Sequence, residues 1–310
     1  MHMAIRLDIV IGCTASGKNQ VAACLAQRLG AEIVVADSMK VYRRMDIGTA
    51  KPTPEHRKII RYHLVDVAEP SESFSAKRYA QLADAAIADI VSRGKRVIVA
   101  GGTALYLQAL VEGLFEGPSA DPGFRQEFRR RAAREGLSAL HAELARVDPA
   151  TAAQVHPNDL RRIERALEIH ALTGTPISAL RTQWGSTRPD YDVHYIGVRR
   201  DRQEASVRIN QRVMKMVELG LVDEVRRLLA EPQPLSLQAS QAVGYAEIIA
   251  HLEGRISLDE AIEQIKINTR HLAKAQRTWF RRFSPVHWFD AGPDELAEAL
   301  CERTLRDYNW

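Results

Sequence analysis

The sequence has few features of a membrane or extracellular protein. None of its apolar runs approaches the ~20 residues that a membrane-spanning helix requires, so a membrane role has no support. Only three cysteines are present, Cys13, Cys24 and Cys301, and their spacing shows no paired pattern. We therefore expect neither a disulfide framework nor a zinc site, and we expect the protein to work in the reducing environment of the cytoplasm.

The composition is that of an ordinary globular protein. Hydrophobic residues make up 45% and charged residues 26% of the 310 positions, and the formal net charge is only +4. A chain of this length can bury a sizeable core as one large domain or as a domain with an insertion. The small net charge neither demands nor excludes an anionic partner, so the distribution of charge has to decide.

One motif near the start of the chain predicts a phosphate-binding loop. The apolar run Ile9-Val10-Ile11 leads into Gly12, and Gly17-Lys18 follow at the spacing G-x-x-x-x-G-K. Glycines let successive backbone N–H groups point inward, and the following helix and lysine add positive charge. The predicted anion-binding residues are Gly12, Thr14, Ala15, Ser16, Gly17, Lys18 and Asn19.

The first hundred residues alternate between strand and helix patterns. β-Branched runs predict strands at 33–36, 63–67 and 96–100, and apolar periodicity predicts a helix over 75–91, with Leu82 on its packed face. This alternation is typical of an α/β fold with a parallel sheet flanked by helices. Since ligands bind beyond the carboxyl ends of such strands, we expect the phosphate loop, Asp37-Ser38 and residues 101–103 to meet.

The pattern changes after residue 117. Helices are predicted over 124–135, 137–146 and 159–172, and strand patterns return only at 193–198 and 286–289. We interpret 118–190 as an inserted all-helical subdomain and 1–117 with 191–310 as the P-loop core domain. The arginine clusters of the insertion fit a solvated helix surface as well as a binding surface.

A stronger charge signal lies near the end of the chain. Five cations at spacings of 4, 4, 3 and 4 share one face of a predicted helix: Lys266, Arg270, Lys274, Arg277 and Arg281. Opposite them, and expected to pack inward, are Ile262, Ile265, Leu272, Trp279 and Phe283. Cations without interleaved carboxylates favour a polynucleotide backbone as the facing surface.

The phosphate loop lacks the usual companions of an ATPase. Position 19 is Asn where the motif has Ser or Thr, whose hydroxyl would contact Mg²⁺, and the one strand that ends in an acidic residue ends at Asp37. Asp37 can be read as a metal-anchoring carboxylate or as a base that takes a proton from a nucleophile beside the phosphates. Small-molecule kinases use a carboxylate in the second way, so a P-loop kinase is an alternative.

Six motifs in order resemble those of one family. They are GCTASGKN at 12–19, DSMKVYRRMDIGTAKPT at 37–53, GGTALYLQALVEG at 101–113, HPNDLRRIERALEI at 156–169, QAVGYAE at 241–247 and TRHLAKAQRTWFR at 269–281. The chain resembles the tRNA dimethylallyltransferases, also called tRNA isopentenyltransferases, over nearly its whole length. The DIGTAKP segment is the most specific of these motifs.

The resemblance implies a prenyl transfer to RNA. A dimethylallyl group would pass from dimethylallyl diphosphate to the N6 amine of the adenosine 3′-adjacent to the anticodon, with release of pyrophosphate. The phosphate loop and Arg212 would hold the pyrophosphate, Asp37 would accept the amine proton, and Thr103 would hydrogen-bond in the same channel. The resemblance also implies Mg²⁺ as cofactor, the anticodon stem-loop of tRNA as partner, and a monomer.

Family tRNA contacts carry over to Asp37, Ser38, Met39, Lys40, Thr103, Arg125, Arg161, Arg162, Arg165, Gln241, Gly244, Tyr245, Lys274, Arg277 and Arg281. Three positions depart from the family pattern. Asn19 replaces Ser or Thr, so we expect its amide oxygen to reach Mg²⁺ weakly or through water. Lys40 replaces the usual Gln and weakens Asp37 as a base. Ala275 stands where an Arg is common.

The departures leave further alternatives open. A tRNA-binding relative that has lost the chemistry would bind tRNA without turnover. An adenylate prenyltransferase would use a free nucleotide, but it would need neither the helical insertion nor the cationic helix.

Overall fold

The computed structural model describes residues 4–115, 117–180, 185–293 and 295–310. The chain forms two compact units, which we call unit 1, Met1–Val111 with Thr187–Trp310, and unit 2, Glu112–Ser186. Unit 2 therefore begins six residues before, and ends four residues before, the 118–190 predicted from the sequence. Each unit has its own hydrophobic core.

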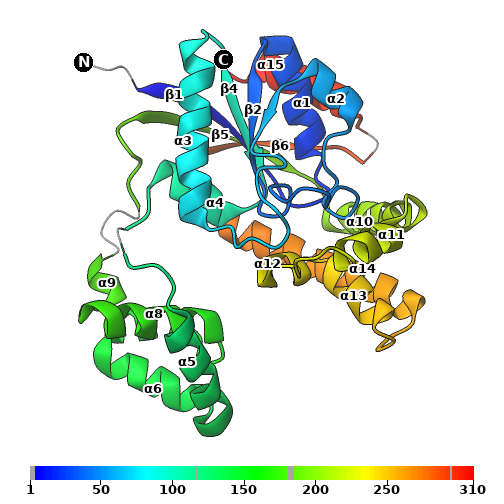
Figure 1. The fold of residues 1–310 in the computed structure, drawn as a ribbon. Helices are drawn as coiled ribbons and strands as arrows, with labels where there is room; N and C mark the ends of the chain where they lie inside the picture. Colours follow the sequence, from blue (N-terminus) through cyan, green and yellow to red (C-terminus); the bar gives the residue numbers. More distant parts are fainter. Residues whose placement is uncertain (1–3, 116, 181–184, 294) are drawn as a thin grey trace. The chain divides into compact units, whose positions relative to one another are not determined.

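Unit 1 is built on a six-stranded sheet (Figure 1). Its strands are β1 (Ile5–Ile11), β2 (Glu32–Ala36), β3 (Tyr62–His63), β4 (Val97–Gly101), β5 (Tyr191–Arg199) and β6 (Val286–Asp290). The spatial order is β3-β2-β4-β1-β5-β6, and every neighbouring pair is parallel. The predicted parallel α/β fold is confirmed.

Helices cover both faces of this sheet. In unit 1 they are α1 (Lys18–Leu29), α2 (Pro54–Ile59), α3 (Ala76–Ser92), α4 (Ala104–Val111), α10 (Arg202–Glu218), α11 (Leu221–Leu229), α12 (Leu237–Ser240), α13 (Tyr245–Leu252), α14 (Leu258–Phe280) and α15 (Ala297–Asp307). Ile9 and Ile11 of β1 pack with α3, α4 and α14, whereas Val10 packs with α1 and α15. Because successive side chains of a β-strand point to opposite faces of the sheet, β1 contributes residues to two separate hydrophobic cores.

Two local predictions need correction. The strand expected at 63–67 is only Tyr62–His63, because Leu64 and Asp66 adopt left-handed backbone conformations with φ of 63° and 59°. Such conformations cannot continue a strand. Leu82 was expected on the packed face of α3 but is 37% exposed.

Unit 2 consists of short helices. They are α5 (Pro122–Glu135), α6 (Leu137–Val147), α7 (Pro149–Ala152), α8 (Leu160–Thr173) and α9 (Ile177–Leu180). Their core is centred on Phe128, Leu140, Leu144 and Ile163, each at most 2% exposed. Within the described residues, none of the helices combines the length and the apolar character that crossing a membrane requires.

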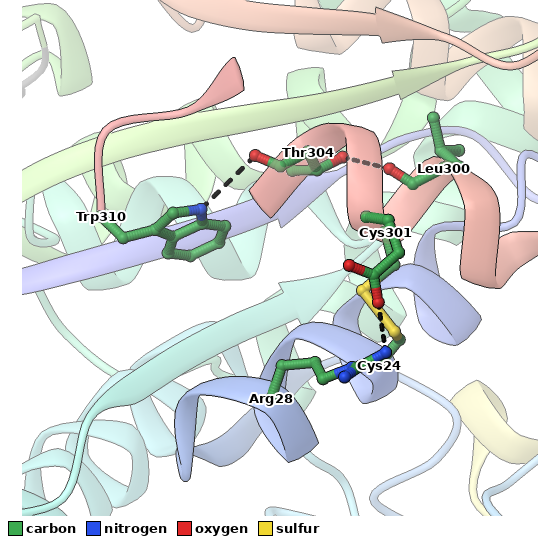
Figure 2. Close-up of a disulfide and its surroundings, with 7 residues drawn as sticks. Cys24, Arg28, Leu300, Cys301, Thr304 and Trp310 are labelled. Atoms are coloured by element: carbon green, nitrogen blue, oxygen red, sulfur yellow. Dashed lines mark hydrogen bonds and ion pairs between the residues drawn. A yellow bond between two sulfur atoms is a disulfide. The ribbon is translucent and has the colours of Figure 1, made fainter. Parts of the chain in front are cut away.

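The cysteine prediction is wrong for two of the three residues. Cys24 of α1 and Cys301 of α15 form a disulfide across 277 positions of sequence (Figure 2). Cys13 is buried and not disulfide-bonded. The spacing of the cysteines carried no trace of this pair, because α1 and α15 become neighbours only by packing on the same face of the sheet. The number of cysteines therefore no longer supports a reducing compartment.

Candidate active site

Strand register brings three predicted loops to one edge of the sheet. Ile11 at the end of β1 and Ala36 at the end of β2 both lie opposite Gly101, the last residue of β4. The phosphate loop, Asp37 and Gly102-Thr103 each follow directly. The meeting point expected from the sequence is thus a consequence of the ladder.

The phosphate loop has the backbone of an anion-binding turn. Gly17 has a φ of 96°, and a Cβ at Gly12 would lie 2.6 Å from Ser16 Oγ and 2.7 Å from Val198 O. Within the described part of the chain, the N–H groups of Ala15, Gly17 and Asn19 make no hydrogen bond. These donors, at the N-terminus of α1, are available to a phosphate group.

Lys18 lies under this loop. Its side-chain amine is 3.5 Å from the carbonyl oxygen of Cys13, and the residue is only 8% exposed. Burial, together with the positive charge of Lys40, lowers the pKa of Lys18 to about 8. An anion bound in the loop would raise this pKa again and so favour the charged form of the lysine.

Asp37 is oriented by its own backbone turn. Its Oδ1 accepts hydrogen bonds from the N–H groups of Met39, at 2.9 Å, and Lys40, at 3.2 Å. Oδ2 has no hydrogen-bond partner among the residues that the structure describes, so it can accept a proton. Oδ1 therefore holds the backbone turn, and Oδ2 is the oxygen that could act as a base.

Thr103 fixes the neighbouring residue. Its Oγ1 accepts a 2.9 Å hydrogen bond from the Ser38 N–H and donates a 3.3 Å hydrogen bond to Ser38 Oγ, while its own N–H bonds Ala36 O. The predicted pair Asp37 and Thr103 is therefore joined through Ser38.

Arg212 of α10 belongs to the same charged group. Burial lowers the pKa of Arg212, and the opposing influence on that pKa is the negative charge of Asp37. Its proposed contact with pyrophosphate stays a prediction.

Gln276 of α14 is a site residue that the sequence analysis missed. Its Oε1 accepts the Thr14 N–H at 2.8 Å, and its Nε2 donates to the Gly102 carbonyl at 2.9 Å. A Cβ at Gly102 would lie 2.4 Å from Nε2, so a larger residue there would displace the Gln276 amide. The side chain joins the phosphate loop to the end of β4. The sequence could have indicated this role, because Gln276 lies on the packed side of the predicted helix. A single Gln at such a position is easily taken for a surface residue.

The cationic face of α14 is only partly free. Lys266 pairs with Glu263 at 2.7 Å, Arg270 donates to Asn210 Oδ1 at 2.8 Å, and Arg277 lies 3.8 Å from Cys13 Sγ. Lys274 and Arg281 are exposed and have no acidic partner among the described residues. On the opposite side the prediction for Leu272 is wrong, because this residue is 42% exposed.

The predicted tRNA-contacting arginines of unit 2 have protein partners. Arg125 and Arg165 both bond the fully buried carboxylate of Glu168, and Arg165 also donates to Pro118 O at 2.8 Å. Arg162 pairs with Asp159 at 3.3 Å, and Arg161 is exposed on the same helix, α8. Contact of these residues with tRNA stays a prediction.

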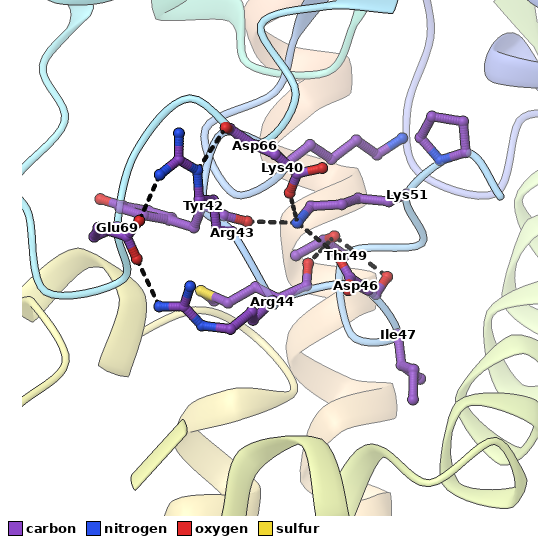
Figure 3. A network of polar contacts seen from close by, with 12 residues as sticks. Lys40, Tyr42, Arg43, Arg44, Asp46, Ile47, Thr49, Lys51, Asp66 and Glu69 are labelled. Carbon is purple, nitrogen blue, oxygen red and sulfur yellow. Dashed lines mark hydrogen bonds and ion pairs between the residues drawn. The ribbon is translucent and has the colours of Figure 1, made fainter. Parts of the chain in front are cut away.

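The Gln241–Tyr245 segment supports the DIGTAKP loop. The fully buried Tyr245 donates to Glu224 Oε1 at 2.6 Å, and Glu224 accepts the N–H groups of Asp46 and Ile47. Lys51 of the same loop bonds Asp46 and Asp66 (Figure 3). The Gly244 N–H is itself bonded to Glu247 Oε2 at 2.7 Å, and contact of Gln241, Gly244 and Tyr245 with tRNA stays a prediction.

The residues around the loop offer Mg²⁺ few ligands of their own, and its binding stays a prediction. This ion prefers oxygen ligands, and in phosphate-binding sites it usually keeps several waters and takes one or two protein ligands together with substrate phosphates. Asn19 offers one exposed amide oxygen and Asp37 offers Oδ2, while the described residues contain no group of three or more His, Cys, Asp or Glu that could hold a metal by themselves. Lys18, Lys40 and Arg212 add positive charge that repels a cation.

Comparison with known proteins identifies the family. The family model described as IPP transferase matches residues 40–283. The chain is 49% identical to a tRNA dimethylallyltransferase of Geobacter metallireducens, with 92% of each protein covered, and 48% identical to tRNA dimethylallyltransferase 2 of Geotalea uraniireducens, with 97% and 96% covered.

Solved structures agree with these relatives. The structure is similar to the tRNA delta(2)-isopentenylpyrophosphate transferase of Staphylococcus epidermidis, with a TM-score of 0.69, 33% identity and 98% of each chain covered. A eukaryotic dimethylallyltransferase described as acting on tRNA matches with a TM-score of 0.75 and 27% identity over 93% of this chain and 74% of the other. On this evidence the chain belongs to the tRNA dimethylallyltransferase, or IPP transferase, family.

Proposed function

We propose that the chain transfers the dimethylallyl group of dimethylallyl diphosphate to the N6 amine of the adenosine 3′-adjacent to the anticodon of tRNA, with release of pyrophosphate. One observation supports this most directly. The register of β1, β2 and β4 brings the phosphate loop and Asp37 to one edge of the sheet, and among the described residues the N–H groups of Ala15 and Gly17 and the Oδ2 of Asp37 have no hydrogen-bond partner. A site for the leaving pyrophosphate and a candidate base, Asp37, thus lie at the same edge of the sheet.

The transfer of the dimethylallyl group needs no reactant beyond the two substrates and these protein groups. The carbon–oxygen bond to the diphosphate breaks and its electron pair leaves with pyrophosphate, while the amine nitrogen forms the new bond to carbon. The amine proton passes to Asp37 Oδ2, since the adenine amine is a poor nucleophile until that proton is accepted. Lys18 and the N–H groups of Ala15 and Gly17 stabilise the charge that develops on the leaving group.

The adenine has to leave its stack to reach Asp37, which costs a few kcal/mol. Contacts to the tRNA backbone would offset this cost, and exposed cations such as Lys274 and Arg281 are suited to them. We further propose that the chain acts as a monomer in the cytoplasm, the compartment of this substrate.

The test is incubation with unmodified tRNA and dimethylallyl diphosphate, followed by mass spectrometry of the nucleosides. Prenylated adenosine in tRNA, and none when adenosine monophosphate replaces tRNA, is the expected result. Absence of the product at every magnesium concentration would contradict the proposal. Phosphate transfer from ATP that needs no RNA would instead support the kinase alternative.

A further inference from the structure

Arg200 is a buried arginine that directly follows β5, the strand beside β1. Its side chain is only 2% exposed. Three acceptors hold its Nη1: the carboxylate of Glu204, the Gly292 carbonyl at 2.8 Å and the Pro293 carbonyl at 3.2 Å. Because the guanidinium group is a rigid planar fork, contacts at Nη1 fix the direction of its other donors as well.

The other donors of this guanidinium group have no partner within the described residues. Nε is buried without a hydrogen bond, and Nη2 makes none either. An exposed arginine would satisfy such donors with bulk water, but this side chain is buried. A buried charged group with unpaired donors is costly unless an anion approaches it.

The unpaired Nη2 lies against the phosphate loop. It is 4.0 Å from the position that a Cβ at Gly17 would occupy. The end of β5 also meets the loop at Gly12, where a Cβ would lie 2.7 Å from Val198 O. The N–H of Gly17, which precedes α1, makes no hydrogen bond among the described residues. An unpaired donor of Arg200 and an unpaired N–H of the loop therefore lie at the same glycine.

We propose that Arg200 binds the diphosphate through Nη2, at the phosphate group that the Gly17 N–H faces. A guanidinium group donates charge-assisted hydrogen bonds to phosphate oxygens, and its charge does not vary with pH in the physiological range. Lys18 supplies one cation from within the loop, and Arg200 supplies a second from the end of β5. The inference rests on the proposed function for the identity of the anion.

The contacts at Nη1 give this cation a fixed position before the substrate arrives. Glu204 belongs to α10, whereas Gly292 and Pro293 follow β6, so two separate segments hold the guanidinium group. A side chain that is already ordered loses little conformational entropy when it binds a ligand. Sequence spacing could not indicate this role, because Arg200 is distant in sequence from the loop.

Calorimetric titration with inorganic pyrophosphate tests the contact. Arg200→Met should lose about tenfold in affinity, equivalent to one charge-assisted hydrogen bond, and Arg200→Lys should recover part of that loss. Because Arg200→Met leaves Glu204 unpaired, the double variant with Glu204→Gln removes both charges and should show the same loss of affinity. Glu204→Gln alone keeps the cation and should bind within about threefold of the wild type.

Arg199→Met is the matched control. Arg199 adjoins Arg200 in sequence, but its side chain is 52% exposed and pairs with Asp290 at 2.8 Å. Its loss removes the same charge from a solvated position and should leave pyrophosphate affinity unchanged. Thermal unfolding shows whether each variant is folded, and the double variant serves where Arg200→Met alone is unstable.

The inference is overturned if the folded double variant binds pyrophosphate as tightly as the wild type. It is also overturned if Arg199→Met weakens binding as much as Arg200→Met does. A role in stability alone would lower the unfolding temperature and leave the Kd for pyrophosphate unchanged.

The two proposals fail separately. Weaker pyrophosphate binding in the Arg200 variants, without prenylation of tRNA by the wild type, would reject the proposed function and keep this inference. Prenylation of tRNA by the wild type, with pyrophosphate affinity that does not depend on Arg200, would do the reverse.

Discussion

Cations in the two units serve different purposes. In unit 2, Arg125 and Arg165 are bound to the buried Glu168, and Arg131 bridges Glu135 and Glu143. In unit 1, Lys18 and Lys40 are buried, and their side-chain amines have no carboxylate partner among the residues that the structure describes. Arginines of unit 2 thus join its helices, whereas these two lysines of unit 1 are available to an anion. A count of charges cannot show this difference.

Asp37→Asn should give the largest effect. Asn keeps an oxygen that accepts the N–H groups of Met39 and Lys40, but it cannot take a proton from the amine. We expect kcat to fall by about 10²–10⁴-fold, the usual contribution of a general base, while the Kd for tRNA stays within about twofold. Single-turnover kinetics and tRNA binding measure the two. An unchanged kcat would contradict the role of base.

Glu168→Gln probes the paired cations of unit 2. Removing the charge from a fully buried partner of two arginines should lower the free energy of unfolding by about 1–3 kcal/mol, with no change in pyrophosphate affinity. Glu127→Gln, at an exposed pair with Arg130, is the matched control and should cost well under about 1 kcal/mol. Equal losses would remove the contrast between the units.

The same site predicts a pH dependence. Burial alone would raise the pKa of Glu168, but the hydrogen bonds from Arg125 and Arg165 outweigh it and hold the pKa below its ordinary value. The stabilisation is therefore present above the unfolded pKa of about 4.3 and is lost as the pH falls through the folded value. Acid unfolding should be less steep in Glu168→Gln, as thermal melts below about pH 5 would show.

Gln276→Met tests whether the loop of unit 1 needs its bridge. Met has similar length but bonds neither the Thr14 N–H nor the Gly102 carbonyl, so the loop should become less ordered. We expect kcat/KM for the diphosphate substrate to fall about tenfold and the Thr14 amide to exchange faster with solvent. Gln264→Met, on the exposed face of the same helix, should change neither quantity.

The pKa of Lys18 predicts how diphosphate binding follows pH. The amine is charged below about pH 8 and neutral above it, because burial and the charge of Lys40 lower its pKa, with Asp37 opposing and Arg212 adding to the shift. Pyrophosphate affinity should therefore be highest below pH 8 and fall by up to about tenfold per unit above it. Lys18→Arg, which does not titrate, should give a flatter profile in calorimetry.

Lys274→Gln should give the smallest effect. Lys274 is exposed on α14, so its loss should weaken tRNA binding about twofold to threefold and reduce the salt dependence of log K by about 0.7–0.9, as for one phosphate contact. Ala275→Arg should change both quantities in the opposite direction. Affinity measured at several salt concentrations distinguishes the two.

Part of this site was predictable because it depends on local sequence. Gly12, Gly17 and Lys18 lie within one loop, and Asp37 and Thr103 each follow a strand directly, so strand register alone brings them together. The parallel sheet followed from the same alternation of strand and helix. Gln276 was missed because its partners Thr14 and Gly102 are distant in sequence and its residue type carries no signal.

The sequence by itself determined the phosphate loop, the α/β class and the family, since these depend on short-range spacing and on motifs in order. Only the tertiary structure decided which charges are paired and which cysteines are joined. Glu168 pairs with two arginines and Cys24 bonds Cys301, whereas the side-chain amine of Lys40 has no hydrogen-bond partner among the described residues. The physical reason is that burial and proximity are properties of packing, and a charge costs or contributes energy according to what lies beside it in space.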